Sequence, residues 1–144
     1  MLHEFSYVSP QSREELLSFL DAHGDEAVVF SGGTDLFVNI RANLAKPGVV
    51  VDLKGIKDFH ALSYGQEGLH IGCCVTVNEV VSDSTVREHF SILHIAGSEL
   101  ATYQLRNRAT VVGNVVTASP CGDMSSPLLV LGAEMIISSK GETR

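Results

Sequence analysis

The stretch 28-VVFSGGTDLFVNI-40 places an apolar run directly before a Gly-Gly pair and a second apolar run shortly after it. Continuous apolar residues at 27–30 predict a buried strand. Gly32 and Gly33 have no Cβ, so the backbone can take positive φ and approach a ligand closely there. Successive N–H groups in such a turn form a nest for an anion, and a helix starting after Asp35 adds its N-terminal dipole. The stretch therefore predicts a strand–turn–helix unit that can hold a phosphate.

Two established phosphate motifs are absent from this turn. No Lys-Ser/Thr pair follows the second glycine, which excludes a Walker A loop, and no G-x-G-x-x-G pattern marks a dinucleotide fingerprint. The hydroxyl of Thr34 is an additional group that could reach a phosphate. A tight strand-to-helix turn without any ligand stays open as the alternative interpretation.

Outward from this turn, strands and helices alternate along the chain. The expected strands are 5–10, 27–30, 49–53, 61–64, 69–73, 110–120 and 135–139. The expected helices are 12–24, one or two turns at 36–40, a short helix after Thr76, 90–101 and 123–132. Ser12 with Glu15, and Thr76 with Glu79, have the spacing of capping boxes, which predicts two of the helix starts. In the helix at 90–101, the apolar residues expected on one face are Ile92, Leu93, Ala96 and Leu100.

Composition limits the possible classes of protein. The chain has 144 residues, 44% of them hydrophobic, with a net charge of −7, which indicates one folded domain and argues against a nucleic-acid partner. No apolar run is long enough to cross a membrane, and the first residues do not resemble a secretory signal. Three cysteines, two of them adjacent, do not suggest a disulfide framework, so we expect the cytoplasm as location.

A second polar segment, 103-YQLRNRATVVGNVVTASPCGD-123, concentrates hydrogen-bonding side chains among β-branched residues. These are Arg106, Asn107, Arg108, Thr110, Asn114, Thr117, Ser119 and Asp123. Asn114 and Thr117 could donate to phosphate or ribose oxygens, and Asp123 could accept from a ribose hydroxyl. The alternative is a polar turn network in which Asp123 is the N-cap of the next helix.

Several motifs occur together and in a fixed order. They are SGGTDL at 31–36, IGCCVT at 71–76, QLRNRATVVGN at 104–114, ASPCGD at 118–123 and PLLVLGA at 127–133. In this order and at these separations, the chain resembles the flavin-binding subunit of the molybdenum hydroxylases, the family of xanthine, carbon monoxide and nicotinate dehydrogenases. The resemblance covers nearly the whole chain, and it implies that the bound phosphate belongs to FAD.

The resemblance implies an α+β fold with FAD between two small subdomains, at about 1–55 and 56–144, in one FAD-binding domain spanning 1–144. The family subunit is about twice as long, and its C-terminal domain is missing here. The residues that the resemblance assigns to FAD are Val29, Phe30, Ser31, Gly32, Gly33, Thr34, Asp35, Leu36, Ala101, Thr110, Val111, Val112, Gly113, Asn114 and Asp123, with Thr117 and Ser119 as weaker candidates. Val112 replaces a glycine of the family, and its Cβ would resist a positive φ.

The implied function is electron transfer within a multisubunit oxidoreductase. Electrons from a molybdopterin-binding subunit would pass through a [2Fe–2S] subunit to FAD and then to an acceptor such as NAD⁺. A purine or another N-heterocycle is the expected substrate of the complex, while carbon monoxide and carbonyl compounds remain possible. The sequence suggests no catalytic nucleophile–base pair, and its histidines lack metal-site spacing.

Three alternatives remain open from the sequence. A separate chain could supply the missing C-terminal domain, or the sequence could be a fragment. The chain could also be a non-catalytic module that assembles with partners and holds nucleotide weakly. A third possibility is another flavoenzyme of similar fold, such as an alcohol oxidase or a reductase of cell-wall precursors, although the ordered motifs at 104–120 argue against it.

Overall fold

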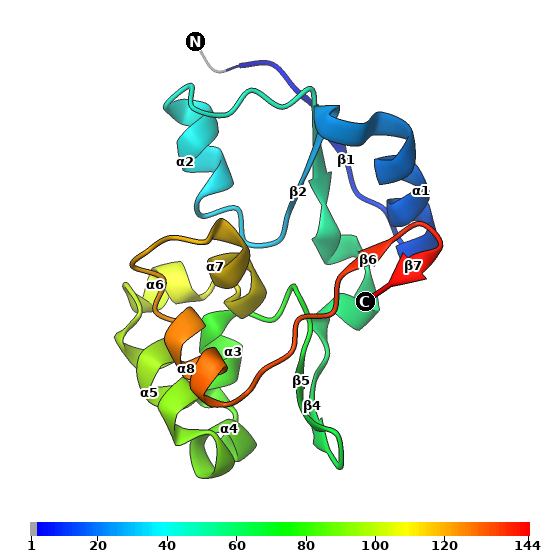
Figure 1. Ribbon diagram of the computed structural model, residues 1–144. Coiled ribbons are helices and arrows are strands. Elements are labelled where there is room, and N and C mark those ends of the chain that lie inside the picture. The colour runs from blue at the N-terminus through cyan, green and yellow to red at the C-terminus, as the bar shows by residue number, and fades with distance from the viewer. Residues whose placement is uncertain (1–2) are drawn as a thin grey trace.

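A three-stranded parallel sheet is built from the first part of the chain (Figure 1). The computed structural model describes residues 3–144. The elements of this part are β1 (Ser6–Val8), α1 (Arg13–His23), β2 (Ala27–Phe30), α2 (Leu36–Arg41) and β3 (Val49–Asp52), with a 3₁₀ turn at Gly24–Glu26. β3 lies in the centre, and Phe30 at the end of β2 is in register with Asp52 at the end of β3. The segments that follow these two strands therefore leave the sheet side by side.

Both faces of the sheet are covered. Successive side chains of a strand point to opposite faces, so neighbouring residues of the central strand report on both. Val50 and Val51 in the central strand are both fully buried. Val51 packs with Leu16 of α1 on one face, and Val50 packs with Phe30 and Ile40 on the other. These contacts explain why the apolar runs at 27–30 and 49–53 form strands.

The second part of the chain is an antiparallel hairpin followed by a cluster of short helices (Figure 1). After 3₁₀ turns at Leu53–Gly55 and Lys57–His60 come β4 (Leu62–Gly65), β5 (Gly68–Ile71), α3 (Val77–Ser82), α4 (Ser84–His89), α5 (Ser91–Glu99), α6 (Tyr103–Arg106), α7 (Val111–Thr117) and α8 (Ser125–Val130). Val77, Leu93, Val111 and Met124 lie in one apolar core that joins α3, α5 and α7.

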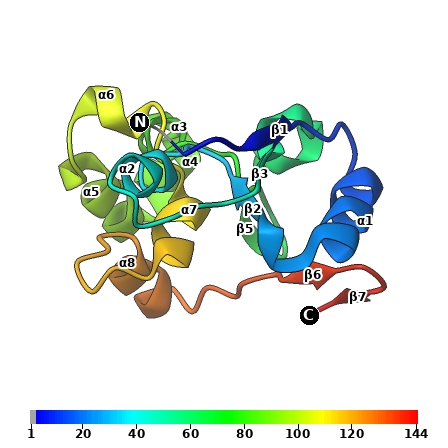
Figure 2. The ribbon, with the colours of Figure 1, turned by 90° about the horizontal axis from the view of Figure 1, so that it is seen from above.

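The end of the chain returns to the first part. β6 (Ser138–Ser139) and β7 (Glu142–Thr143) form a small antiparallel hairpin. Two views show this hairpin beside α1 (Figures 1 and 2). Lys140 Nζ lies 2.8 Å from Asp21 Oδ2, and Arg13 donates a hydrogen bond to Ser138 Oγ. The segment between α8 and β6 therefore runs from the helical part to the sheet part.

The strand predicted at 110–120 is wrong, because residues 111–117 form α7. Thr110 is its N-cap, with Oγ1 accepting a hydrogen bond from the Gly113 N–H at 3.0 Å. The β-branched valines favour a strand by propensity alone. Here Val111 is buried in the core, and a helix that is capped and packed in this way overrides the propensity.

The backbone of Val112 also differs from the expectation. It lies in the first turn of α7, and within residues 3–144 the non-glycine residues with positive φ are Asn43, Ala101 and Ala118. A valine is therefore accommodated here without the steric conflict that a left-handed conformation would cause.

Three smaller predictions also need correction. The strand predicted at 135–139 is shorter, since β6 contains only 138–139. The turn predicted at Lys140–Gly141 is confirmed. Of the apolar residues expected on one face of α5, Leu93 and Leu100 are buried, whereas Ile92 is 40% exposed. Ser12 caps α1 as predicted, but Glu15 accepts from the Gln11 N–H, so the box is not reciprocal. The Thr76–Glu79 capping box is present in full.

Candidate functional site

The loop after β2 is in tight contact with the segment before α7. A Cβ added to Gly32 would lie 2.0 Å from the Arg108 carbonyl oxygen, so no other residue fits there without movement. Gly33 has a different constraint, since its φ is +74° and a Cβ would meet the Phe37 ring at 2.7 Å. Gly32 thus permits a close backbone approach, and Gly33 permits the turn into α2.

This loop carries a run of backbone donors that the fold does not use. Within residues 3–144, the N–H groups of 32–36 form no hydrogen bond, whereas Phe37 N–H donates to the Gly33 carbonyl at 3.2 Å. Unpaired N–H groups of this kind are normally satisfied by water or by a ligand. An anion with several oxygens, such as a pyrophosphate, matches this set of donors.

Two side-chain contacts join the same loop to α7. Thr110 Oγ1 donates to Ser31 Oγ, and Thr117 Oγ1 donates to Asp35 Oδ2, each at 3.5 Å. The N-terminus of α7 lies beside that of α3, because the Thr76–Thr110 bridge pairs the residues that precede the two helices. The loop at 31–35 and the start of α7, which the sequence analysis singled out separately, are therefore neighbours.

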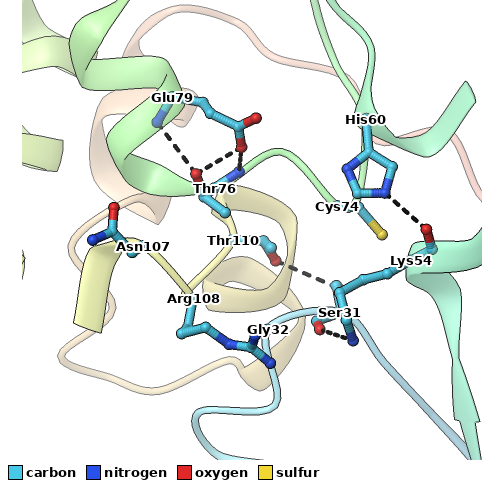
Figure 3. A pocket seen from close by; sticks show the side chains of 10 residues that line it. All are labelled: Ser31, Gly32, Lys54, His60, Cys74, Thr76, Glu79, Asn107, Arg108 and Thr110. Carbon is cyan, nitrogen blue, oxygen red and sulfur yellow. Dashed lines mark hydrogen bonds between the residues drawn. The ribbon is translucent and has the colours of Figure 1, made fainter. Parts of the chain in front are cut away.

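A cavity of about 270 Å³ opens along this junction (Figure 3). Its lining consists of Ser31, Gly32, Lys54, His60, Cys74, Thr76, Glu79, Asn107, Arg108 and Thr110. Only Ser31, Gly32 and Thr110 of these were assigned to FAD from the sequence. The cavity is smaller than the usual site for a drug-sized ligand, so it can enclose only part of a dinucleotide.

Lys54 is the lining residue that the sequence analysis missed most clearly. Its Nζ lies 2.6 Å from Asp52 Oδ1, 3.0 Å from the Ser31 carbonyl oxygen and 4.0 Å from the centre of the Phe30 ring. The available signal was position, because a polar residue within two positions of the end of a central parallel strand lies at the edge where such sheets bind ligands.

Asp52 holds Lys54 in place and is itself buried. Tyr7 Oη donates to Asp52 Oδ2 at 2.6 Å, and the Lys54 N–H donates to Oδ1 at 2.9 Å. Burial by itself raises the pKa of Asp52, but the hydrogen bonds from Lys54 and Tyr7 outweigh it and hold this pKa below its usual value. The hydrogen bond to Asp52 in turn raises the pKa of the Tyr7 hydroxyl. The carboxylate is therefore ionised at neutral pH and pairs with the Lys54 ammonium.

The left-handed residue Ala101 is held by a second polar network. Arg106 Nη1 donates to the carbonyl oxygens of Ser98 at 2.8 Å, Leu100 at 2.9 Å and Ala101 at 3.4 Å. Its Nε donates to Asn78 Oδ1 at 3.0 Å, and Asn78 is buried. These contacts keep Ala101 exposed with a φ of +45°.

The predicted residues divide into a group near the junction and a group outside it. Ser31, Gly32, Gly33, Thr34, Asp35, Leu36, Thr110, Val112 and Gly113 belong to the loop or to the first turn of α7. Phe30 and Val111 are 8% and 1% exposed and lie in the cores, whereas Val29 is 41% exposed on β2.

The residues at the far end of α7 have other contacts. Asn114 Oδ1 accepts from the Met124 N–H at 3.2 Å, which ties the following loop to the helix. The side chain of Asp123 forms no hydrogen bond within the described part of the chain, and Met124 occupies the N-cap position of α8. The alternative role of Asp123 as a helix cap is therefore wrong. Ser119 Oγ accepts from the Cys121 N–H at 3.2 Å within the same loop.

The remaining reactive groups do not form a catalytic cluster. All three cysteines are free; Cys74 is buried, and Cys121 is exposed. Hydrogen bonding with Cys73 and burial raise the pKa of the Cys74 thiol, so this sulfur in the cavity wall stays protonated. Among residues 3–144, no three His, Cys, Asp or Glu side chains are grouped so that they could hold a metal ion. No helix in the same range is long and apolar enough to cross a membrane.

The chain matches, over residues 3–144, the family model described as the FAD binding domain in molybdopterin dehydrogenase. It is 31% identical over 144 residues to the nicotinate dehydrogenase FAD-subunit of Eubacterium barkeri, covering 99% of this chain and 49% of that protein. It is 28% identical to the glyceraldehyde dehydrogenase medium chain of Sulfolobus acidocaldarius, covering 98% of this chain and 50% of that protein. The chain therefore spans about half the length of the curated relatives it matches.

A solved structure is also similar to this chain. Quinoline 2-oxidoreductase from Pseudomonas putida 86 superposes with a TM-score of 0.94 at 29% identity, over 100% of this chain and 50% of that chain. This likeness confirms the α+β fold that the resemblance implied. The two curated relatives are named as a subunit and a chain of dehydrogenases, and FAD is the cofactor of the family. The chain belongs to the family of FAD-binding domains of the molybdopterin dehydrogenases, as its ordered motifs predicted.

Proposed function

We propose that this chain supplies part of the FAD site in the electron-transfer subunit of a molybdenum hydroxylase, and that 1–144 is one FAD-binding unit divided near residue 55. The observation that carries the proposal is the junction of the loop at 31–36 with the start of α7, where unused backbone N–H groups lie beside a cavity. Backbone donors bind a pyrophosphate without basic side chains, which suits a chain of net charge −7. FAD supplies the redox chemistry when bound, and the chain supplies binding and orientation.

In this proposal the loop at 31–36 holds the pyrophosphate, and the first turn of α7 forms the opposite wall. Ala101 packs against the cofactor, and Asp123 is free to accept a hydrogen bond from a ribose hydroxyl. No described side chain has to transfer a proton, since electron transfer through a flavin needs none from the protein.

The proposed complex contains a molybdopterin-binding subunit and a [2Fe–2S] subunit, with electrons passing from the clusters through FAD to an acceptor such as NAD⁺. We infer a purine or another N-heterocycle as substrate. The names of two relatives, nicotinate dehydrogenase and quinoline 2-oxidoreductase, support an N-heterocycle, while glyceraldehyde dehydrogenase shows that the family is broader. We propose the cytoplasm as location, because all three cysteines are free.

We also propose that a polypeptide corresponding to the half of the relatives' length not spanned here docks on this chain, as a separate subunit or as further sequence. An exposed apolar strip favours this. It consists of Leu129, Val130, Leu131, Met135, Ile136 and Ile137, which are 38–79% exposed. Within the described residues the N–H groups of 134–136 form no hydrogen bond, so this segment offers an unpaired edge to a partner strand.

The test is an absorption spectrum of the purified chain, taken before and after addition of FAD and removal of the excess by gel filtration. Retained flavin bands at a one-to-one ratio support the proposal, and a Gly32→Ala chain that retains less FAD assigns the binding to this junction. If neither the chain nor its mixture with the complementary half retains FAD, the proposal is wrong. FAD retention only in the mixture supports the docking of the second half.

The second candidate function is a non-catalytic module that assembles with partners and holds nucleotide weakly. The small cavity and the length of the chain relative to its relatives favour it. A mixture with the complementary half that binds FAD, but whose FAD takes no electrons from the reduced iron–sulfur subunit, would support this candidate. Reduction of the bound FAD by that subunit would reject it.

A further inference from the structure

Lys54 reaches the loop after β2 because of the sheet topology. β2 and β3 are parallel neighbours, and Phe30 pairs with Asp52 at their ends. The 3₁₀ turn after β3 therefore emerges beside the loop that starts at Ser31, and the Lys54 side chain extends toward that loop (Figure 3). No sequence motif or family comparison assigned a role to this residue.

Three contacts restrain the Lys54 ammonium. A carboxylate oxygen of Asp52 lies 2.6 Å away, the Ser31 carbonyl oxygen 3.0 Å away, and the Phe30 ring centre 4.0 Å away. A lysine is usually a mobile, hydrated cation, so this degree of restraint is uncommon on a side chain that is 33% exposed. Hydrogen bonds from an ammonium to oxygen acceptors are also stronger than neutral ones.

The contact with Ser31 determines the direction of a backbone donor. The peptide bond is planar and trans, so the carbonyl of Ser31 and the N–H of Gly32 point in opposite directions. Because the carbonyl is directed at Lys54, the Gly32 N–H is directed away from it. This N–H is the first of the unused donors at 32–36.

We propose that Lys54 is a positioning residue for FAD: its ammonium fixes the Ser31–Gly32 peptide, so that the backbone donors of the loop are oriented before the pyrophosphate binds. This inference rests on the proposed function of that loop. The Asp52 carboxylate, which is only 7% exposed, holds the ammonium through a hydrogen bond of 2.6 Å. Preorganised donors raise affinity by removing the cost of ordering them on binding.

The test compares Lys54→Met with Tyr7→Phe in the full chain. Lys54→Met removes the bond to Ser31, whereas Tyr7→Phe removes a bond to Asp52 and leaves Ser31 untouched. Each variant removes one hydrogen-bond donor to the buried Asp52 carboxylate. Tyr7→Phe is therefore the control for a general loss of stability. We expect Lys54→Met to weaken binding of FAD, and of ADP as a smaller pyrophosphate probe, by about tenfold, and Tyr7→Phe by less than about twofold.

Amide NMR spectra of the unliganded chains give a second readout that does not depend on FAD. We expect the Gly32 and Gly33 amide resonances to shift in Lys54→Met and to stay in place in Tyr7→Phe. Unchanged resonances together with unchanged affinity in Lys54→Met would overturn the inference. Equal effects of both variants on the resonances and on affinity would also overturn it, because they would indicate a structural role only.

The two readouts separate this inference from the proposed function. If the wild-type chain binds neither FAD nor ADP, alone or with the complementary half, the proposed function fails. The glycine resonances still decide whether Lys54 orients the loop. If the wild-type chain binds and only the Lys54 comparison fails, the proposed function stands without this positioning role.

Discussion

Gly32 and Gly33 are adjacent in the chain, yet the structure requires them for different reasons. Gly33 has the left-handed backbone that the Gly-Gly pair predicted, whereas Gly32 does not. Gly32 is required because the carbonyl of Arg108 occupies the space of a side chain. The sequence indicated a flexible turn, but it could not indicate this contact, because Arg108 is 76 positions away along the chain.

We predict that Gly32→Ala destabilises the chain by about 1–3 kcal/mol, the usual effect of forcing atoms into a packed site. Its Cβ would lie 2.0 Å from a backbone oxygen, which cannot move as a flexible side chain can. Urea unfolding followed by circular dichroism measures the change. Gly65→Ala is the matched control, because a Cβ there meets nothing within 4 Å, and we expect it to stay within about 0.5 kcal/mol. Equal stability of the two variants would contradict the close approach.

The Asp52 carboxylate makes the stability depend on pH in a definite direction. Its folded pKa lies below the usual value of 3.8, because the hydrogen bonds from Lys54 and Tyr7 outweigh the effect of burial. A depressed folded pKa contributes stability that is fully present above the unfolded pKa and is lost as the pH falls through the folded pKa. The contribution is therefore complete at pH 7 and declines below about pH 4.

We predict that Asp52→Asn lowers the free energy of unfolding at pH 7 by about 1–3 kcal/mol, since it leaves the Lys54 ammonium without its counter-charge. The difference from the wild type should shrink at pH 3, where the wild-type carboxylate approaches protonation. Urea unfolding at both pH values measures it. A difference that is constant or larger at pH 3 would show that Asp52 acts only through packing. Asp21→Asn, in the exposed pair with Lys140, is the control and should change stability little at either pH.

The secondary structure could be predicted where local signals and packing agree. Ser12 and Thr76 marked helix starts, the apolar runs at 27–30 and 49–53 became strands, and the Gly65–Gly68 turn became a hairpin. The prediction was wrong at 111–117, where the valines favour a strand but Thr110 caps a helix whose first residue is buried. Thr110 is followed by no Glu or Gln at the capping-box position, so the sequence lacked the usual sign of that helix start.

The cap on α7 can be tested by Thr110→Val, which keeps the β-branched shape and removes the hydroxyl. We predict a loss of about 1 kcal/mol, because the Gly113 N–H loses its acceptor at 3.0 Å. Hydrogen exchange should show faster exchange of the Gly113 and Asn114 amides.

Thr110→Ser is the matched control for this change, because it retains the acceptor oxygen. We expect its stability to lie within about 0.5 kcal/mol of the wild type and its α7 amides to keep their protection. If Thr110→Val exchanges as slowly as Thr110→Ser, the hydroxyl does not hold the start of the helix.

The candidate site depends on how distant segments meet, and only part of it was visible in the sequence. The motifs at 31–36 and 104–114 were recognised one by one, and the fold joins them through Gly32 with Arg108 and through Ser31 with Thr110. Lys54 and His60 line the same cavity from a segment outside the recognised motifs. A sequence pattern shows which residues could bind, whereas the meeting of these segments is a property of the tertiary structure.

We expect the exposed apolar strip to affect association with a partner more than it affects the stability of this chain. Leu129 is 79% exposed and Ile136 is 66% exposed, so neither contributes much to the stability of this chain. A large patch of exposed apolar surface usually marks an interface. We predict that Leu129→Ser and Ile136→Ser leave the free energy of unfolding within about 0.5 kcal/mol of the wild type. Each should weaken association with the complementary half at least about tenfold, measured by calorimetry.

Leu44→Ser is the matched control for these variants, because Leu44 is also 79% exposed but lies after α2 and outside the apolar strip. It removes the same amount of exposed apolar surface, so it should leave the association unchanged if the strip is the interface. Equal weakening by Leu44→Ser and Leu129→Ser would mean that the association depends on general surface hydrophobicity. Weakening confined to the strip would show that its exposed residues and the unpaired backbone at 134–136 form one docking edge.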